Sequence, residues 1–168
     1  MVESIRLIKK YGNPTLETLA WERRNMKVWN VPPLIHLAIP QIPSRIYMHR
    51  VFIPVAEQWL KALVEAGVSN EIKTFDGCFN IRTKRGAKSL SIHAFGMAID
   101  LNAAHNPLGL SRQQCLLRGL IPFTEKFINV SRKYVDCGAD WQTRQDLMHF
   151  QIKGAQAYGP GPNDSETQ

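Results

Sequence analysis

The most regular hydrophobic pattern in the chain lies in its first half. Apolar side chains recur there every three or four residues, at Val51, Val55, Trp59, Leu63 and Ala66. This spacing places them on one face of a helix. Gly67 follows directly and is a typical helix end, because glycine adopts the left-handed backbone of a helix terminus at little cost. The pattern predicts a helix over residues 51–66 with one buried face.

The first 46 residues have a weaker pattern. A predicted helix over residues 15–27 begins at a plausible cap and carries apolar residues on one side, at Leu16, Leu19, Ala20 and Trp21. Residues 31–44 contain four prolines, so we expect this segment to be irregular or extended. No motif assigns a function to residues 1–46, and the role of this N-terminal segment stays open.

After the long helix the hydrophobic period changes to two. Residues 72–82 alternate around Asp76 and Gly77, which favours a strand, a turn and a second strand. Residues 96–102 alternate again, and residues 147–152 form a short final strand. Successive side chains of these segments therefore point to opposite faces of a sheet.

One or two helices are predicted within residues 111–134, punctuated by Gly119 and Pro122. Helices come first along the chain and strands later, in no repeating order. This order predicts an α+β fold, in which a single domain packs N-terminal helices on a largely antiparallel sheet.

The chain has 168 residues, about the size of one domain, and a formal net charge of +7. A positive surplus favours encounter with an anionic partner, such as nucleic acid, a membrane surface or an anionic wall polymer. Lysine and arginine are spread along the chain without a long basic run, and no nucleic-acid motif accompanies them. We therefore expect no nucleic-acid partner.

Apolar runs are too short for a membrane span, which takes about 20 residues. The most apolar segment, residues 31–43, is broken by prolines and by His36. The first thirty residues lack the apolar core of a secretion signal. We expect a soluble protein that is made in the cytoplasm without a signal peptide and does not insert stably in a membrane. Residues 158–168 are rich in turn formers, so we expect a disordered tail.

Three cysteines occur in the sequence, at Cys78, Cys115 and Cys137. Their odd number and wide spacing argue against a disulfide framework and against a thiolate zinc site. We expect them to be reduced and buried.

Candidate chemistry lies in and around the predicted strands. Within residues 96–102, the apolar side chains face a core and Asp100 stands on the other face among small neighbours. His93 lies just before this strand, and alternation in the final strand places His149 and Gln151 on one face. Two histidines and Asp100 could therefore converge on one sheet surface.

Catalytic Zn²⁺ commonly takes two histidines and a carboxylate and keeps a fourth position open. A single histidine beside an apolar strand is, however, more often a hydrogen-bonded structural residue. Spacing alone leaves both interpretations open. The other histidines match no motif and are expected to be structural or exposed; they are His36, His49 and His105. Three tryptophans are expected in the core, at Trp21, Trp29 and Trp59.

A ten-residue motif favours the metal site. Its fixed positions are Ser91, His93, Gly96, Ala98 and Asp100. It resembles the Ser-x-His-x-x-Gly-x-Ala-x-Asp signature of the M15 peptidase family, which includes D-Ala-D-Ala carboxypeptidases, D-Ala-D-Ala dipeptidases and phage L-alanyl-D-glutamate endopeptidases. A second motif of that family, an acidic residue three positions before a histidine, is matched by Asp146 and His149 in the form typical of the phage branch. The resemblance extends from about residue 47 to residue 152.

The resemblance implies a zinc peptidase core over residues 47–157 with a hedgehog/DD-peptidase-like fold. It implies one Zn²⁺ per chain, bound by His93, Asp100 and His149. Asp146 corresponds to the acidic residue that acts as general base and acid.

The resemblance assigns the remaining site residues less directly. Arg82 corresponds to an arginine that stabilises the scissile carbonyl, and Arg85 is a rival for that role. Ser91 is expected to orient a ligand or the substrate, or else to make a turn hydrogen bond. Trp141 is expected to contact the substrate or to pack beside the second motif. The phage branch usually carries a Trp-Gly-Gly-x-Trp-like stretch there, of which residues 138–141 keep only part.

The family suggests a peptidoglycan hydrolase. The resemblance to the phage branch implies an endopeptidase that cuts the stem peptide between L-Ala and D-Glu, and thus an endolysin that reaches the wall once a holin has permeabilised the membrane. We expect a monomer whose partner is bacterial peptidoglycan. Two alternatives remain, a D-Ala-D-Ala carboxypeptidase and a non-catalytic zinc-containing binding module.

Overall fold

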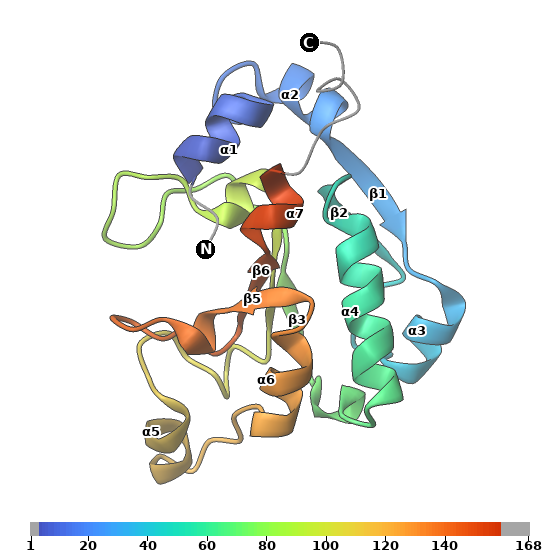
Figure 1. Ribbon diagram of the computed structural model, residues 1–168, viewed down its shortest axis with the longest axis vertical. Coiled ribbons are helices and arrows are strands. Elements are labelled where there is room, and N and C mark those ends of the chain that lie inside the picture. Colours follow the sequence, from blue (N-terminus) through green and yellow to red (C-terminus); the bar gives the residue numbers. More distant parts are fainter. Residues whose placement is uncertain (1–3, 159–168) are drawn as a thin grey trace.

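A four-stranded antiparallel sheet forms the centre of the molecule, in the order β3-β4-β6-β5. The computed structural model describes residues 4–158 (Figure 1). The strands of this sheet are short, and they are β3 (Phe75–Gly77), β4 (Ala98–Leu101), β5 (Val135–Cys137) and β6 (His149–Ile152). Strands β4 and β6 are the two central strands, so residues on them are held from both sides.

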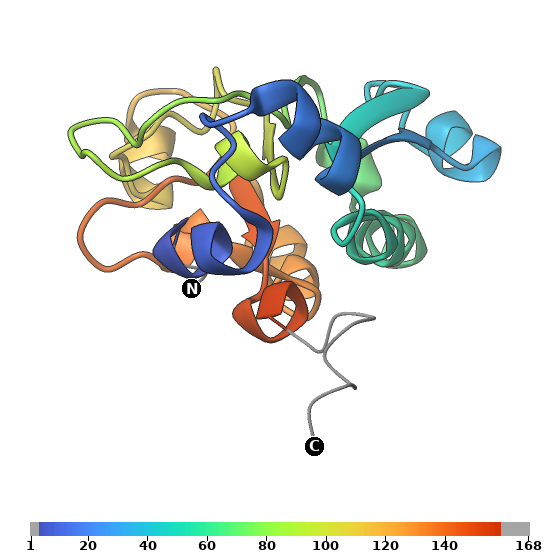
Figure 2. The same ribbon diagram turned by 90° about the horizontal axis from the view of Figure 1, so that it is seen from above.

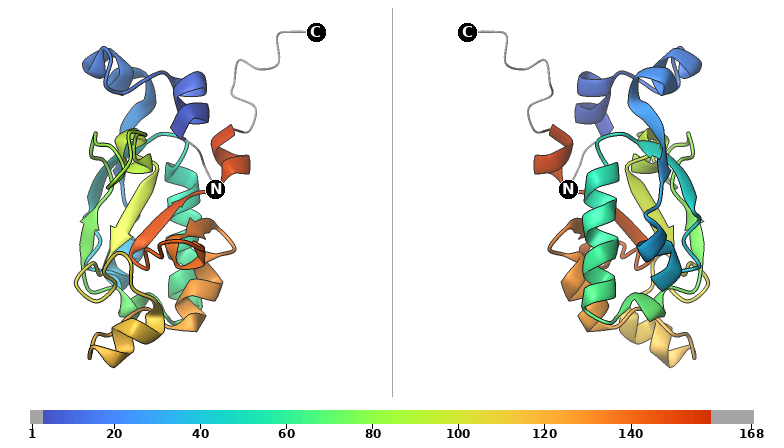
Figure 3. Two further views of the ribbon diagram at one scale, coloured as in Figure 1. Left: turned by 90° about the vertical axis from the view of Figure 1, so that its left-hand side faces the viewer. Right: turned by 90° about the vertical axis from the view of Figure 1, so that its right-hand side faces the viewer.

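Two helices, α4 (Ile53–Glu65) and α6 (Glu125–Ser131), lie on the same side of this sheet (Figure 3). Trp59 of α4 and Phe127 of α6 both contact Phe150 of β6, with ring centroids 4.9 and 5.8 Å apart. The Trp59 indole also donates to Ser131 Oγ at 3.0 Å, which satisfies its buried N–H. This face of the sheet is the hydrophobic core, and the opposite face is left for polar side chains.

The predicted helix over residues 51–66 is confirmed as α4, and Gly67 ends it with a φ of 69°. Two helices occur within residues 111–134, as expected; they are α5 (Arg112–Leu117) and α6. The α+β class and the antiparallel pairing are also confirmed. Periodicity succeeded for α4 because one face of this helix is buried.

The N-terminal part contains more structure than the sequence predicted. Its elements are α1 (Ser4–Tyr11), α2 (Thr18–Asn25), β1 (Met26–Asn30), α3 (Pro33–Ala38) and β2 (Arg45–His49). Strands β1 and β2 pair in a separate antiparallel sheet. Helix α1 packs against α7 (Gly154–Tyr158), where Tyr11 Oη donates to the Ala157 carbonyl at 2.7 Å (Figures 1 and 2). The two ends of the described chain therefore lie side by side.

The helix predicted over residues 15–27 is shorter than expected. Helix α2 begins at Thr18 because Glu17 has a left-handed backbone, with a φ of 47°. Of the apolar side chains expected on the buried face, Leu16 and Leu19 are exposed, whereas Trp21 is buried in the core. The helix gives way to strand β1 at its end because pairing with β2 outweighs the local helical pattern.

Two further expectations were wrong. Residues 31–44 are not wholly irregular, because they contain helix α3, which begins at Pro33. Proline is tolerated in the first turn of a helix, since the N–H that it lacks would have no partner within the helix. Asp76 and Gly77 do not form a hairpin turn within residues 72–82. They lie inside β3, which pairs with β4 across a register shift. The partner strand is distant in sequence, so local alternation could not reveal it.

The three cysteines are buried and form no disulfide, as expected. Trp21, Trp29 and Trp59 lie in the core. Among residues 4–158 no helix is long and apolar enough to cross a membrane. The predicted disordered tail falls on residues 159–168, which lie outside the described part, whereas Tyr158 is the last residue of α7.

Candidate metal centre

The polar face of the central strands brings three predicted ligands together. Asp100 on β4 and His149 on β6 are direct partners in the antiparallel register. His93 comes from the short 3-10 helix η2 (Ile92–Phe95), which leads into β4. Ser91 caps this helix, since its Oγ accepts from the His93 N–H at 3.3 Å. Strand pairing and one cap therefore fix all three side chains on rigid elements.

The three ligand atoms form a nearly equilateral triangle. Asp100 Oδ1 lies 3.1 Å from His93 Nε2 and 3.1 Å from His149 Nδ1. The two histidine nitrogens are 3.2 Å apart. A tetrahedral Zn²⁺ with bonds of about 2.0–2.1 Å to its ligands keeps them about 3.3 Å apart. The spacing of the three atoms fits one zinc ion.

The other ring nitrogen of each histidine is engaged outside the triangle. His93 Nδ1 lies 2.8 Å from the carbonyl of Cys78, which can only accept, so Nδ1 carries the proton. His149 Nε2 lies 3.0 Å from Gln151 Oε1, so it donates there. When both histidines are neutral, their remaining nitrogens face Asp100 Oδ1 with lone pairs. These three acceptors repel one another, and either a proton shared with Asp100 or a bound cation removes this repulsion.

The charges of these groups agree with a cation site. Burial opposes ionisation of Asp100, but hydrogen bonds with His149 and His93 hold its pKa well below the usual value. Burial also opposes the charged form of His149, yet Asp100 raises its pKa. The thiol of Cys78 is close by, but burial raises its pKa, which disfavours the thiolate that zinc would require. The donor set is therefore two histidines and a carboxylate, with no thiolate.

Asp146 lies close enough to this centre for the charges of His149, Asp100 and His93 to act on it, but it does not belong to the triangle. Burial raises the pKa of Asp146 to about 6, an effect opposed by His149, His93 and Arg85. Its Oδ1 is buried and has no hydrogen-bond partner within residues 4–158. A carboxylate with a pKa near neutrality and a free oxygen is suited to accept and release a proton.

The backbone of Asp146 is held by a close approach to Gly138. The Asp146 N–H donates to the Gly138 carbonyl at 3.0 Å. A Cβ placed on Gly138 would overlap the Asp146 carbonyl oxygen and lie 3.0 Å from Asp146 Cβ. Only glycine fits at position 138. Residues 138–141 match the family stretch only in part, but they keep the glycine that the backbone requires.

A cavity of about 840 Å³ opens onto the centre. Its walls include four predicted site residues outside the triangle, namely Arg82, Ser91, Trp141 and Asp146. Trp141 stacks obliquely over His149, with ring centroids 5.2 Å apart. Arg85 also lines the cavity, and within the described residues neither Arg82 nor Arg85 forms an ion pair. Both arginines are therefore available to a bound anion.

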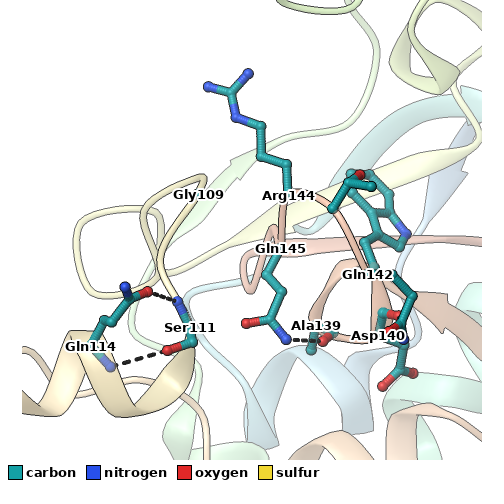
Figure 4. Close-up of a pocket in the computed structure, with 10 residues that line it drawn as sticks. Gly109, Ser111, Gln114, Ala139, Asp140, Gln142, Arg144 and Gln145 are labelled. Carbon is teal, nitrogen blue, oxygen red and sulfur yellow. Dashed lines mark hydrogen bonds between the residues drawn. The ribbon is translucent and has the colours of Figure 1, made fainter.

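A second cavity, of about 440 Å³, lies against residues 139–145 (Figure 4). Its polar groups are largely occupied by the protein itself. Ser111 and Gln114 form a reciprocal capping box at the start of α5, and Gln145 donates to the Ala139 carbonyl at 2.8 Å. Asp140 pairs with Arg132 at 2.7 Å. We therefore place the reactive site in the larger cavity.

Two residues at the site were not assigned a role from the sequence. Gln151 was placed on the face of His149 by strand alternation, but its contact with the ring was not inferred. Gly138 was noticed only as part of a motif. The remaining histidines have structural contacts, such as His36 Nδ1 with the Ile42 carbonyl at 2.8 Å, and none belongs to the triangle.

Comparison with known proteins agrees with this site. Residues 85–152 match a family model of M15 peptidases that is described as D-alanyl-D-alanine carboxypeptidase. The matched segment contains the three triangle residues and Asp146, and it begins after Arg82. No curated protein matches the chain.

Proposed function

Since residues 85–152 are those of an M15 family peptidase, we propose that this chain is a zinc-dependent peptidoglycan endopeptidase that acts as a phage-type endolysin. The bond that we propose is the one between L-Ala and D-Glu of the stem peptide. One observation carries the peptidase activity. Three converging ligand atoms lie in an open cavity beside the carboxylate of Asp146, whose Oδ1 has no hydrogen-bond partner among residues 4–158.

The residues of the site have distinct roles in the proposed reaction. His93, Asp100 and His149 would hold the metal, which when bound supplies a Lewis acid that polarises the substrate carbonyl and acidifies water. Asp146 accepts the proton of the attacking water and passes it to the leaving nitrogen, as its raised pKa allows. Without a proton the amine would leave as an unstable anion, so both transfers are needed.

An arginine would stabilise the negative charge that develops on the carbonyl oxygen. We favour Arg85 over Arg82, because the charge of Arg85 acts on Asp146 at the reacting centre. Arg82 Nη1 instead lies 3.5 Å from the carbonyl of Thr83. Loss of one such donor typically slows an enzyme about 100- to 1000-fold.

The substrate proposal rests on charge and on the phage-type form of the second motif. The stem peptide carries carboxylates, and the cavity presents basic side chains at Arg82, Lys84, Arg85 and Arg144. None of these four forms an ion pair with a described carboxylate. The net charge of +7 also favours encounter with an anionic wall.

A D-Ala-D-Ala carboxypeptidase is the second candidate, favoured by the description of the matched family model. Arg82 and Arg85, which pair with no carboxylate of the described residues, could bind the terminal carboxylate that such an enzyme must recognise. A non-catalytic zinc module is disfavoured, because three ligands suffice to hold metal and a buried carboxylate such as Asp146 would then be retained without use.

Digestion of purified peptidoglycan, followed by mass spectrometry of the new termini, separates these candidates. We expect new D-Glu amino termini and activity that chelation abolishes and Zn²⁺ restores. Release of free D-Ala would establish the carboxypeptidase instead. Tight zinc binding without any hydrolysis of wall or model peptides would establish the binding module.

A further inference from the structure

Gln151 makes the contact that decides which nitrogen of His149 faces the metal centre. Its Oε1 lies 3.0 Å from His149 Nε2, on the side of the ring remote from Asp100. Only 1% of Gln151 is exposed, and its Nε2 is buried without a hydrogen-bond partner in residues 4–158. A buried amide that leaves one group unsatisfied is costly, so its retention requires an explanation.

Strand geometry holds Gln151 beside His149. The two residues are separated by one position on β6 and therefore share a face. Across the sheet Gln151 is paired with Ala98 of β4 on one side and with Asp136 of β5 on the other. Ala98 is fully buried and small, so it leaves room for the longer side chain. The small residue predicted to make room for the site thus makes room for Gln151.

The amide can act on the imidazole in two opposite ways. With Oε1 toward the ring, His149 Nε2 carries the proton and Nδ1 offers a lone pair to the triangle. With the NH₂ group toward the ring, Nε2 must accept, and the proton moves to Nδ1, where it would point at Asp100. A protonated Nδ1 cannot bind a metal. The orientation of the Gln151 amide therefore decides whether His149 can act as a metal ligand.

We propose that Gln151 is a positioning residue that holds His149 in its Nε2–H tautomer and thereby keeps Nδ1 free to bind the metal. This inference rests on the metal site of the proposed function. It predicts an effect on zinc affinity that does not require measurement of hydrolysis. Partners of this kind typically contribute 10- to 100-fold in metal affinity.

Two substitutions test the role. Q151M keeps a side chain of similar length and removes the strong acceptor, so we expect zinc to bind about 10- to 100-fold more weakly. Q151E keeps only acceptors, so the affinity should stay within a few-fold of wild type or rise. Q156M, on the exposed side of α7, is the control for the same change away from the site and should bind zinc normally. Affinities are measured by competition with a chromogenic chelator.

A purely structural role would give a different result. Q151M would then lower the melting temperature of the metal-free protein while its zinc affinity matched that of the wild type. This outcome overturns the inference and leaves the proposed function intact. The inference is also overturned if Q151E loses zinc as severely as Q151M, because Q151E retains the acceptor. A wild-type chain without measurable zinc affinity overturns both proposals.

The wild-type protein supplies a test that survives if Q151M fails to fold. In zinc-loaded protein labelled with ¹⁵N-histidine, we expect the His149 ring to show a protonated Nε2 and a metal-bound Nδ1. The Nε2 proton should exchange slowly, because it is buried in a hydrogen bond. A protonated Nδ1, or a metal on Nε2, overturns the inference directly.

Discussion

At the scale of single residues, the environment of Asp146 is unfavourable for a carboxylate. A buried carboxyl oxygen without a partner is destabilising, and folded proteins rarely keep one. Asp146 is not needed for the triangle, whose three atoms already leave space for substrate and water. Its environment favours proton transfer over stability. Asp100 differs, because its Oδ1 lies 3.1 Å from a nitrogen of each histidine.

Asp146→Asn therefore separates metal binding from turnover. The variant keeps the size of the side chain and loses its basicity, so we expect normal zinc content and hydrolysis slower by at least about 100-fold. Zinc is measured by atomic absorption and hydrolysis on soluble wall fragments. His93→Ala is the comparison, and it should lose metal and activity together. Loss of zinc from Asp146→Asn would show that Asp146 is itself a ligand.

Arg85 should shift the pH at which activity is lost on the acidic side. Asp146 acts as a base only when it is ionised, so kcat/KM should rise as pH increases through the pKa of Asp146. This pKa is about 6 in the metal-free protein, and the positive charge of a metal would lower it. The cation of Arg85 lowers this pKa, so Arg85→Gln should move the acidic limb to higher pH. Lys88→Gln removes the same charge from an exposed neighbour outside the cavity and should leave the limb in place.

At the scale of elements, the fixed positions of the first motif serve geometry as much as chemistry. Ser91 caps η2, and Gly96 ends it with a φ of 65°. A Cβ on Gly96 would lie 2.6 Å from Met26 Cε and 3.0 Å from the His49 amide nitrogen, so glycine also admits the N-terminal hairpin. The sequence suggested that small residues here leave room for ligands, whereas Gly96 leaves room for β1 and β2.

The short 3-10 helix η3 (Gly138–Asp140) positions the second motif, because Gly138 at its start contacts the backbone of Asp146. Gly138→Ala should push the backbone of Asp146 away, destabilise the fold by about 1–3 kcal/mol and slow hydrolysis by about 100-fold, a typical cost of a displacement of 1 Å. Zinc content should change little, because the triangle lies on other elements.

Gly154→Ala provides the control for this change. It adds the same methyl group at the start of α7, where the nearest atom is 3.6 Å away, an ordinary contact. Stability by urea unfolding and kcat on a soluble fragment are compared for both variants. Equal activity of Gly138→Ala and Gly154→Ala would show that the position of Asp146 does not depend on this contact.

At the scale of the whole molecule, His49 joins the N-terminal hairpin to the metal-binding half. Its backbone N–H donates to the Gly96 carbonyl at 3.0 Å, and its ring packs against those of Tyr11 and Trp21. The ring is fully buried, and burial, with a smaller effect of Arg50, lowers its pKa to about 3. Protonation at this junction therefore opposes folding.

The pH dependence of stability follows from the difference between the pKa of His49 in the folded and in the unfolded protein. The unfolded pKa of histidine is about 6.5, so the stabilisation from a neutral His49 is fully present above that pH and is lost as pH falls toward 3. In metal-free protein, the free energy of unfolding should fall by up to about 1.4 kcal/mol per pH unit from this group.

His49→Asn is the informative variant. The asparagine oxygen can replace Nδ1 as acceptor for the Val51 N–H, which lies 3.3 Å away, and it does not titrate. The variant should be less stable at pH 7.5 but should lose less stability than wild type between pH 6.5 and pH 4.5, measured by urea unfolding with chelator present. Parallel pH profiles of the two proteins would exclude His49 as the titrating group.

The sequence by itself determined much of the candidate site and those elements whose pattern is local. Strand alternation allowed a convergence of His93, Asp100 and His149, the resemblance to the family motifs selected it, and the structure shows it. Helix α4 followed from one apolar face. Alternation and helical spacing succeed because residues a few positions apart are placed by backbone geometry alone, whereas the match of His149 to Asp100 depended on the motif.

Tertiary structure alone decided the remainder. The pairing of β3 with β4, the hairpin of β1 and β2, and the packing of α1 on α7 join segments whose local sequence does not encode a partner. The same is true of the contacts that complete the site. Gln151 reaches His149, Gly138 admits Asp146, and Cys78 orients His93 only after distant segments have been brought together by burial of the common core, since hydrophobic association has no fixed sequence separation.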